Sequence, residues 1–252
     1  MEKRRILYFF ILILILAVYS YSSLNFKTGE TIQNENSNEK EIEVAILERV
    51  IDGDTVELKD KRKIRLLGIN TPEKKMPYSE SAKEFLSNFI NETLILEYDK
   101  DKIDKYNRTL GYVFFDNRFL NMEILENGWA NAYMTSNLKY EKTFLRAQAQ
   151  AIKFGRGMWK PSSQNCSSCI KILTLNAKEE YFILENVCSF DCNLNNWFVK
   201  DTGRNVFKLT QIRESEKQQF NSSILKKEVL NNLGDTLFLF DSNGELVLYY
   251  SY

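Results

Sequence analysis

One stretch near the start of the chain, residues 44–73, constrains the fold most, because it alternates short β-forming runs with strong turn signals. Its first run is rich in β-branched and aliphatic side chains, and the Asp52-Gly53 pair that follows favours a hairpin turn. A second turn signal at residues 59–61 precedes another β-forming run, which Pro72 ends. We therefore expect three adjacent antiparallel strands that bring the polar residues of this stretch to one rim.

The chain contains no histidine. This absence excludes a Ser-His-Asp triad, a histidine general base and every imidazole metal ligand. Acid–base chemistry must then be carried out by carboxylates, lysine, tyrosine or thiols. The formal net charge is zero, so no overall electrostatic field attracts nucleic acid, and any such attraction must be local.

Oxygen donors on the predicted rim suit a hard metal cation. Asp54 and Asn70 offer a carboxylate and an amide oxygen, and the Thr71 carbonyl can offer a third ligand. Such a set suits Ca²⁺ or Mg²⁺. Taken alone, Asp54 is equally well explained as a turn residue, because Asp-Gly sequences are common in hairpins. The metal interpretation gains weight only when it is combined with the charged residues around it.

Two arginines and one glutamate complete the chemical set. Arg65 and Arg108 are fork-shaped cations suited to a phosphate group whose negative charge rises in the transition state. Glu73 is the carboxylate left to orient or deprotonate an attacking water. An oxygen-ligated metal, two arginines and one base together predict a phosphodiesterase site.

Three ordered blocks in this region resemble the signature blocks of the staphylococcal nuclease (thermonuclease) family. They are Ile-Asp-Gly-Asp-Thr-Val at residues 51–56, Arg-Leu-Leu-Gly-Ile-Asn-Thr-Pro-Glu at residues 65–73, and Asp-Lys-Tyr-Asn-Arg-Thr-Leu-Gly-Tyr at residues 104–112. The resemblance covers residues 43–159. It implies an OB-fold, a partly open five-stranded barrel with helices, that cleaves DNA and RNA with Ca²⁺.

The resemblance also implies roles for individual residues. Calcium would be held by Asp54, Asn70 and Thr71; catalysis and phosphate binding would fall to Arg65, Glu73 and Arg108; and the nucleotide would contact Lys105, Tyr106 and Tyr133. The family's type member has aspartate where this chain has Asn70, which predicts weaker calcium binding. The alternative function is a catalytically inactive OB-fold that binds nucleic acid while tethered to the membrane. Retention of Asp54, Arg65, Glu73 and Arg108 favours the enzyme.

The beginning of the chain predicts export. A basic start precedes an apolar run at residues 6–21, which is interrupted only by Ser20. Extended by its neighbours, the run approaches the roughly 20 residues that span a bilayer, and it also fits a signal peptide. We expect residues 1–24 to be an uncleaved membrane anchor, with a cleaved signal and a secreted protein as the alternative. The polar residues 25–41 should form a flexible linker.

Residues 42–160 and 161–252 are expected to be separate domains, with the boundary at Pro161 and the polar run after it. The second domain contains short β-forming runs separated by turn signals, which predicts a small immunoglobulin-like β-sandwich. Parts of it resemble a lamin-tail domain; the matching segments are residues 180–186, 194–197, 234–241 and 244–247. This resemblance implies binding or tethering of an unknown partner rather than catalysis.

All four cysteines lie in the second domain: Cys166, Cys169, Cys188 and Cys192. The predicted export favours disulfides, because an oxidising compartment removes free thiols. Each bridge should link the first pair of cysteines to the second, since a bridge between Cys166 and Cys169 closes too small a loop to constrain the chain. A tetrathiolate zinc site is the alternative, followed by a redox-active pair.

Overall fold

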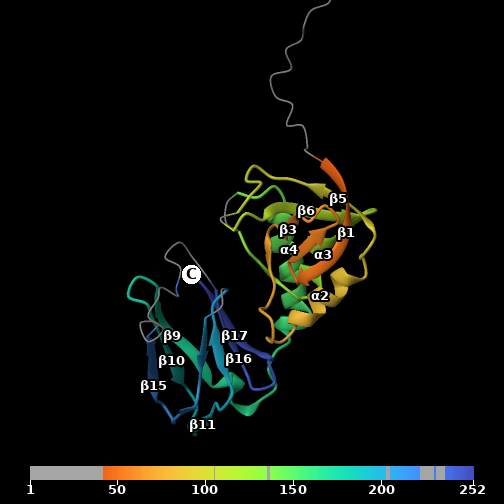
Figure 1. The fold of residues 1–252 in the computed structure, drawn as a ribbon. Helices are drawn as coiled ribbons and strands as arrows, with labels where there is room; N and C mark the ends of the chain where they lie inside the picture. The colour runs from red at the N-terminus through yellow and green to blue at the C-terminus, as the bar shows by residue number, and fades with distance from the viewer. Residues whose placement is uncertain (1–41, 105, 135–136, 203–204, 222–229, 231–235) are drawn as a thin grey trace, which may run out of the picture. The chain divides into compact units, whose positions relative to one another are not determined.

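The computed structural model describes residues 42–104, 106–134, 137–202, 205–221, 230 and 236–252 (Figure 1). The predicted anchor or signal of residues 1–24 and the predicted linker of residues 25–41 lie outside this range. Within it, none of the helices has the length and apolar character needed to cross a membrane.

Five strands form a closed barrel. Along the sheet they run in the order β3-β2-β1-β5-β6, and a parallel pairing of β3 with β6 closes the circuit, while the other pairs are antiparallel. The strands are β1 (Ile42–Asp52), β2 (Thr55–Leu58), β3 (Lys63–Leu66), β5 (Thr93–Glu97) and β6 (Thr109–Phe115). This arrangement confirms the predicted OB-fold barrel and the three adjacent antiparallel strands at its start.

Strand β1 is long enough to pair with two other strands. Its first half pairs with β5 and its second half with β2. Its register with β2 shifts between Leu47 and Arg49 and again between Val50 and Asp52. Such irregularities bend a strand and increase its twist, which allows the sheet to close around a core of buried aliphatic and aromatic side chains.

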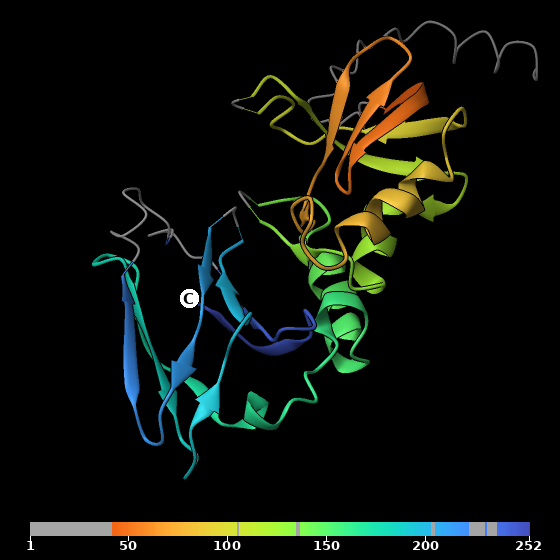
Figure 2. The same cartoon turned by 60° about the horizontal axis from the view of Figure 1, so that its bottom comes forward.

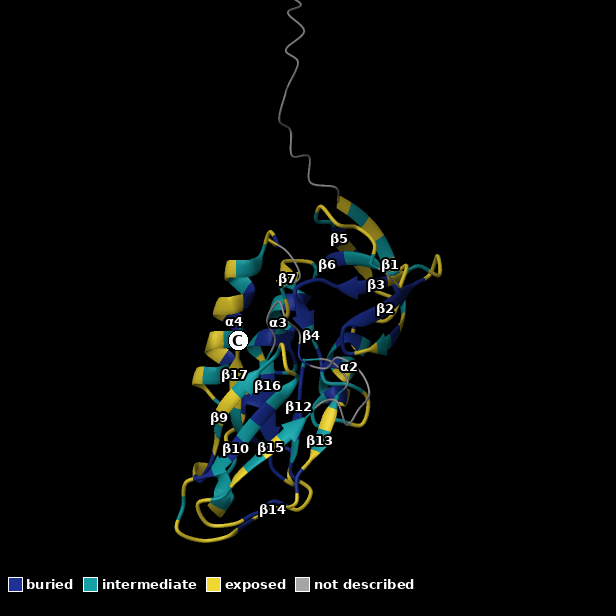
Figure 3. Cartoon of the chain, turned by 90° about the vertical axis from the view of Figure 1, so that its left-hand side faces the viewer, coloured by how far each residue is buried: buried dark blue, intermediate teal, exposed yellow. Residues whose placement is uncertain are grey.

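Three helices pack beside the barrel strands: α2 (Ser79–Ser87), α3 (Leu120–Glu126) and α4 (Glu141–Lys153) (Figure 2). Helix α4 buries one side and exposes the other (Figure 3). Its Phe144 is fully buried against Gly68, where an added Cβ would lie 2.1 Å from Phe144 Cε2. Because Gly68 also has a φ of +75°, only glycine fits there without strain.

Short pairings that the sequence did not predict complete this part of the chain. β7 (Arg118–Phe119) pairs antiparallel with the end of β6, and β4 (Ile69–Asn70) pairs with β8 (Asn131–Ala132). Two-residue strands carry no alternating pattern, so sequence periodicity cannot reveal them. The β4–β8 pairing matters because it fixes the backbone of Asn70 next to that of Asn131.

The second part of the chain is a β-sandwich, as predicted. One sheet has the order β15-β10-β9, a second has the order β13-β12-β16-β17, and β11 pairs with β14. Both sheets contribute to one core, in which Phe182, Trp197 and Leu237 are buried. The elements are η1 (Gly157–Trp159), η2 (Asn165–Ser168), β9 (Ile170–Asn176), β10 (Tyr181–Asn186), β11 (Cys192–Asn193), β12 (Phe198–Lys200), β13 (Val206–Lys208), β14 (Gln211–Ile212), β15 (Lys217–Asn221), β16 (Thr236–Phe240) and β17 (Leu246–Ser251).

Strand β15 was not predicted, because its sequence, Lys-Gln-Gln-Phe-Asn, is almost entirely polar. It lies at a sheet edge, where polar residues are tolerated. Its one aromatic residue, Phe220, stacks on Phe182 of β10 with ring centroids 5.1 Å apart. The lamin-tail resemblance of this domain stays a prediction.

Two disulfides close the sandwich, Cys166–Cys192 and Cys169–Cys188. Each joins one member of the first cysteine pair to one member of the second, which confirms the predicted pattern. No cysteine of the chain is free in this arrangement, so neither the zinc site nor the redox pair is formed.

Candidate active site

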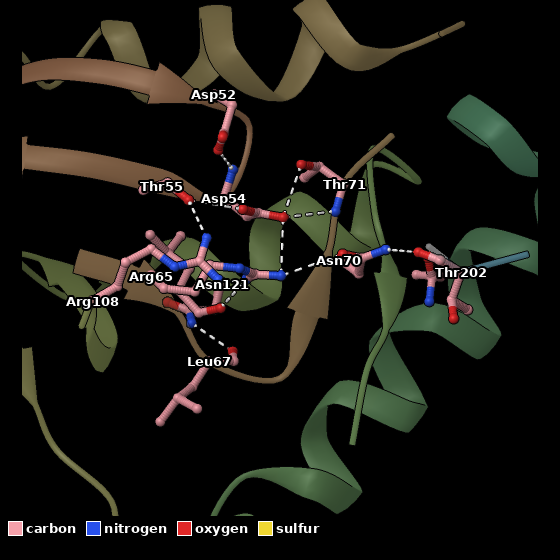
Figure 4. A network of polar contacts seen from close by, with 12 residues as sticks. Asp52, Asp54, Thr55, Arg65, Leu67, Asn70, Thr71, Arg108, Asn121 and Thr202 are labelled. Atoms are coloured by element: carbon pink, nitrogen blue, oxygen red, sulfur yellow. Dashed lines mark hydrogen bonds and ion pairs between the residues drawn. The ribbon is translucent and has the colours of Figure 1, made fainter. Parts of the chain in front are cut away.

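Asp54 lies at the turn between β1 and β2, and its side chain is nearly buried. Its Oδ2 accepts hydrogen bonds from the backbone N–H and the hydroxyl of Thr71, both at 3.0 Å, and its Oδ1 accepts one from the Thr55 hydroxyl at 3.1 Å (Figure 4). Gly53 permits this approach, because a Cβ there would lie 2.8 Å from Thr71 Oγ1. Burial and the charge of Asp54 raise the pKa of the adjacent Asp52. The hydrogen bonds from Thr55 and Thr71 hold the Asp54 carboxylate in one orientation.

Arg65 is held in the barrel wall by β3, opposite Thr55 on β2 and Leu110 on β6. The residue is only 9% exposed, and its guanidinium forms an ion pair with Asp54, with Nη2 and Oδ2 3.1 Å apart. The same Nη2 donates to Asn70 Oδ1 at 3.3 Å. A buried arginine is therefore aligned by two of the three oxygen donors of the predicted metal site, Asp54 and Asn70.

The donor set would suit a hard cation bound at low affinity. Asp54 Oδ2 and Asn70 Oδ1 converge on one positively charged atom, Arg65 Nη2, so the two oxygens are placed to share a cation. Thr71, whose carbonyl is the third predicted ligand, is tied to the same carboxylate. Among the described residues no group of three or more acidic, cysteine or histidine side chains could hold a metal. The site therefore depends on one carboxylate and neutral oxygens, which suits Ca²⁺ at low affinity.

Arg108 is positioned by Asp104. Asp104 Oδ1 accepts from the backbone N–H groups of Tyr106 and Arg108, each at 2.9 Å, and its Oδ2 accepts from Arg108 Nε at 2.7 Å. Burial alone would raise the pKa of Asp104, but the hydrogen bonds from Arg108 reverse this effect and lower it. Arg108 Nη1 also lies 3.5 Å from Thr55 Oγ1, and this contact links the Arg108 side chain to the hydrogen bonds of Asp54 (Figure 4).

A cleft of about 690 Å³ opens beside this network. Its wall includes both arginines together with Tyr106 and Tyr133. Tyr106 is 68% exposed and Tyr133 is 40% exposed, so both side chains reach the solvent. The Arg108 guanidinium lies 5.4 Å from the centre of the Tyr106 ring, a cation–π contact. The predicted nucleotide contact Lys105 lies outside the described residues.

Glu73 lies on the loop between β4 and α2, two residues after Thr71. The side chain is half-buried, and the Glu73 carbonyl accepts the backbone N–H of Met76 at 2.8 Å, which starts a turn. The loop that carries the predicted base is thus the one that carries the predicted metal donors Asn70 and Thr71.

Two residues that contribute to the site could not be identified from the sequence. Asn121 on α3 is fully buried; its Nδ2 donates to the Leu67 carbonyl at 2.8 Å, and its Oδ1 accepts from Val113 N at 2.9 Å. It therefore ties the segment after β3 to β6. Thr202, in the β-sandwich, accepts a hydrogen bond from Asn70 Nδ2 at 2.6 Å. Neither has a local sequence signature, because each acts through a partner far away in the chain.

Comparison with known proteins agrees with this geometry. Residues 63–161 match the family model described as staphylococcal nuclease homologue. A thermonuclease of Staphylococcus hyicus is 33% identical over 164 residues, which is 59% of this chain and 95% of the relative. A thermonuclease of Staphylococcus intermedius is 35% identical over 127 residues, covering 46% and 75%. Endonuclease YncB of Bacillus subtilis (strain 168) is 32% identical over 153 residues, covering 54% and 72%. This chain therefore belongs to the staphylococcal nuclease family.

Proposed function

We propose that this protein is a calcium-dependent endonuclease that hydrolyses the phosphodiester bonds of DNA and RNA with little sequence selectivity. The observation that carries this proposal is the continuous polar network from Arg108 through Thr55 and Asp54 to Arg65. It connects a buried carboxylate to two arginines in the wall of one cleft. The names of the relatives, thermonuclease and endonuclease, support the same chemistry.

The two arginines would bind the phosphate of the scissile bond. Bidentate guanidinium groups donate to phosphate oxygens, and these bonds strengthen as negative charge builds up on the oxygens in the transition state. Arg65 is oriented for this role by Asp54 and Asn70, and Arg108 by Asp104. Both side chains are thus held in place before substrate binds, which reduces the cost of reorganisation.

Glu73 would act as the general base. It lies in the loop between the metal donors and α2, and a carboxylate there can accept a proton from the attacking water. Asp54, Asn70 and Thr71 would hold the calcium ion, which polarises the phosphate and stabilises the charge that develops on it. Since the chain has no histidine, a carboxylate is the natural base at this site.

The cleft explains the proposed substrate range. Exposed aromatic rings such as Tyr106 and Tyr133 stack on any base, and arginines bind the backbone that all nucleic acids share. Stacking requires bases that are unpaired or can be turned out, so single-stranded or locally melted regions should be cut first. Lys105 would add a further contact to the backbone.

We also propose that the enzyme acts outside the cytoplasm, held by its apolar N-terminal segment or secreted. The two disulfides support this location, because such bridges persist in oxidising compartments. The β-sandwich would serve as a lamin-tail-like binding or tethering domain.

The alternative is an inactive OB-fold that only binds nucleic acid. Glu73 argues against it, because a carboxylate facing phosphate weakens binding and has no use without catalysis. The experiment that tests the proposal is incubation of the full chain with plasmid and single-stranded DNA, with Ca²⁺ or with a chelator. We expect both substrates to be degraded only with calcium. Undiminished cleavage in the chelator would contradict the metal assignment, and intact DNA in calcium would favour the binding module.

A further inference from the structure

The β-sandwich packs closely against the nuclease part of the chain within the described residues. A shared apolar cluster includes Met158 and Trp159 from one part and Phe238 and Phe240 from the other. A cavity beside Met158 and Phe240 has a volume of about 10 Å³, which is at the lower limit for holding one water molecule. The two parts therefore share a cluster of buried apolar side chains.

A second contact shows how close this packing is. In the turn between β16 and β17, Gly244 approaches Pro77, which lies between Glu73 and α2. A Cβ at Gly244 would lie 2.3 Å from Pro77 Cγ, far inside any normal contact distance. Any side chain at this position must therefore displace Pro77 or the turn that carries Gly244.

The third contact reaches the candidate active site. Asn70 Nδ2 donates to the Thr202 carbonyl at 2.6 Å, while Asn70 Oδ1 points to Arg65 Nη2 (Figure 4). Thr202 follows β12 and is next to Asp201, whose buried carboxylate accepts from Asn205 N at 3.1 Å. The sandwich thus presents an acceptor to one end of the Asn70 amide.

We propose that Thr202 is a positioning residue, through which the β-sandwich orients the amide of Asn70, a ligand of the proposed calcium site. Holding the amide nitrogen at Thr202 turns the oxygen toward Asp54 and Arg65, where a cation would bind. This inference rests on the proposed calcium-dependent nuclease function. The β-sandwich would then help to shape the active site, by orienting the Asn70 side chain, in addition to any tethering role.

This role of Thr202 explains why the chain has asparagine at position 70. An aspartate has no hydrogen to donate, and at 2.6 Å its oxygen would repel the Thr202 carbonyl. Aspartate would supply more charge to the metal, but it would be incompatible with the contact to the sandwich. Asparagine satisfies both neighbours, at the expense of calcium affinity.

A double-mutant cycle in the full chain tests the proposal. Gly244→Asn adds a Cβ against Pro77 but keeps a residue type that tolerates the positive φ of +76°. Asn70→Asp removes the hydrogen bond to Thr202. Calcium affinity is measured by titration calorimetry without substrate, and thermal unfolding and cleavage rate are measured in parallel. Glu185→Gln is the control, since Glu185 pairs with Lys217 on the three-stranded sheet of the sandwich.

We expect Gly244→Asn to weaken calcium binding about 2- to 10-fold in the Asn70 background, the range for loss of one hydrogen bond. In the Asn70→Asp background it should cause no further change, because the link is already broken. Glu185→Gln should leave calcium affinity unchanged in both backgrounds.

Three outcomes would overturn the proposal. They are an equal effect of Gly244→Asn in both backgrounds, a lower melting temperature without any change in calcium affinity, and the absence of calcium binding by the wild-type chain. A wild-type chain that binds calcium and shows the coupling but cleaves no DNA would instead contradict the proposed function alone.

Discussion

Replacement of Arg65 by lysine tests whether the Arg65 guanidinium binds the phosphate of the scissile bond. Arg65 is buried, 3.1 Å from Asp54 and 3.3 Å from Asn70, so its fork is aligned before substrate binds. Loss of one aligned donor to a developing oxyanion typically costs about 10²–10³-fold in kcat, or roughly 3–4 kcal/mol. Lysine keeps the charge but loses the planar fork, so we expect Arg65→Lys to lower kcat by about 10²-fold.

The structure also sets an expectation for stability. Lysine can still pair with Asp54, and that carboxylate keeps its two hydrogen bonds from Thr71. Arg65→Lys should therefore unfold close to the wild-type temperature, whereas Arg65→Ala leaves a buried charge without its ion-pair partner and should cost about 3 kcal/mol or more.

The assay is single-turnover cleavage of a labelled single strand at saturating calcium. Arg62→Lys is the matched control, because Arg62 pairs with Glu43 and Asp60 and does not line the cleft. It should retain kcat within about twofold, as surface ion pairs contribute little. If Arg65→Lys retained more than half of the wild-type kcat, the assignment of Arg65 to the phosphate would be wrong.

Two further predictions concern the contact between Asp104 and Arg108 and the disulfides. Asp104→Asn should lower kcat by about 10-fold through loss of Arg108 alignment. Because the folded-state pKa of Asp104 is lowered, its stabilising effect is present above the unfolded value of about 3.9 and is lost as pH falls through the folded value. The difference in melting temperature between wild type and Asp104→Asn should therefore be largest near pH 7 and shrink below about pH 4; a constant difference would refute this. Paired replacement of Cys166 and Cys192 by serine should destabilise the sandwich by about 3–4 kcal/mol, since the bridge spans 26 residues. An unchanged melting temperature in calorimetry would contradict that estimate.

The barrel could be predicted because its strands carry local signals. The β-rich runs before and after Asp52-Gly53 and the turn at residues 59–61 define β1, β2 and β3 by composition alone. The ordered blocks then identify the polar residues that the turns bring together. Asp54, Arg65 and Asn70 do meet in the structure, where Arg65 Nη2 lies 3.1 Å from the Asp54 carboxylate and 3.3 Å from the Asn70 amide oxygen.

The remaining features depend on partners that no local pattern encodes. Strand β15 lacks alternation and forms only because β10 offers an edge. The roles of Asn121 and Thr202 arise from contacts 54 and 132 residues away along the chain, with Leu67 and Asn70 respectively. The orientation of the Asn70 amide could not be read from the sequence, because its hydrogen-bond partner Thr202 lies 132 residues further along the chain.

Replacement of Glu73 by glutamine tests the central claim most directly, because it separates catalysis from binding. The variant keeps the shape of the side chain on the loop after β4 but cannot accept a proton from water. In the full chain, binding of a single-stranded oligonucleotide with calcium should be unchanged or slightly tighter, while the cleavage rate should fall about 10²-fold or more. If wild type and Glu73→Gln bound DNA equally and showed the same cleavage rate, Glu73 would not be the base, and hydrolysis would have to proceed without this carboxylate.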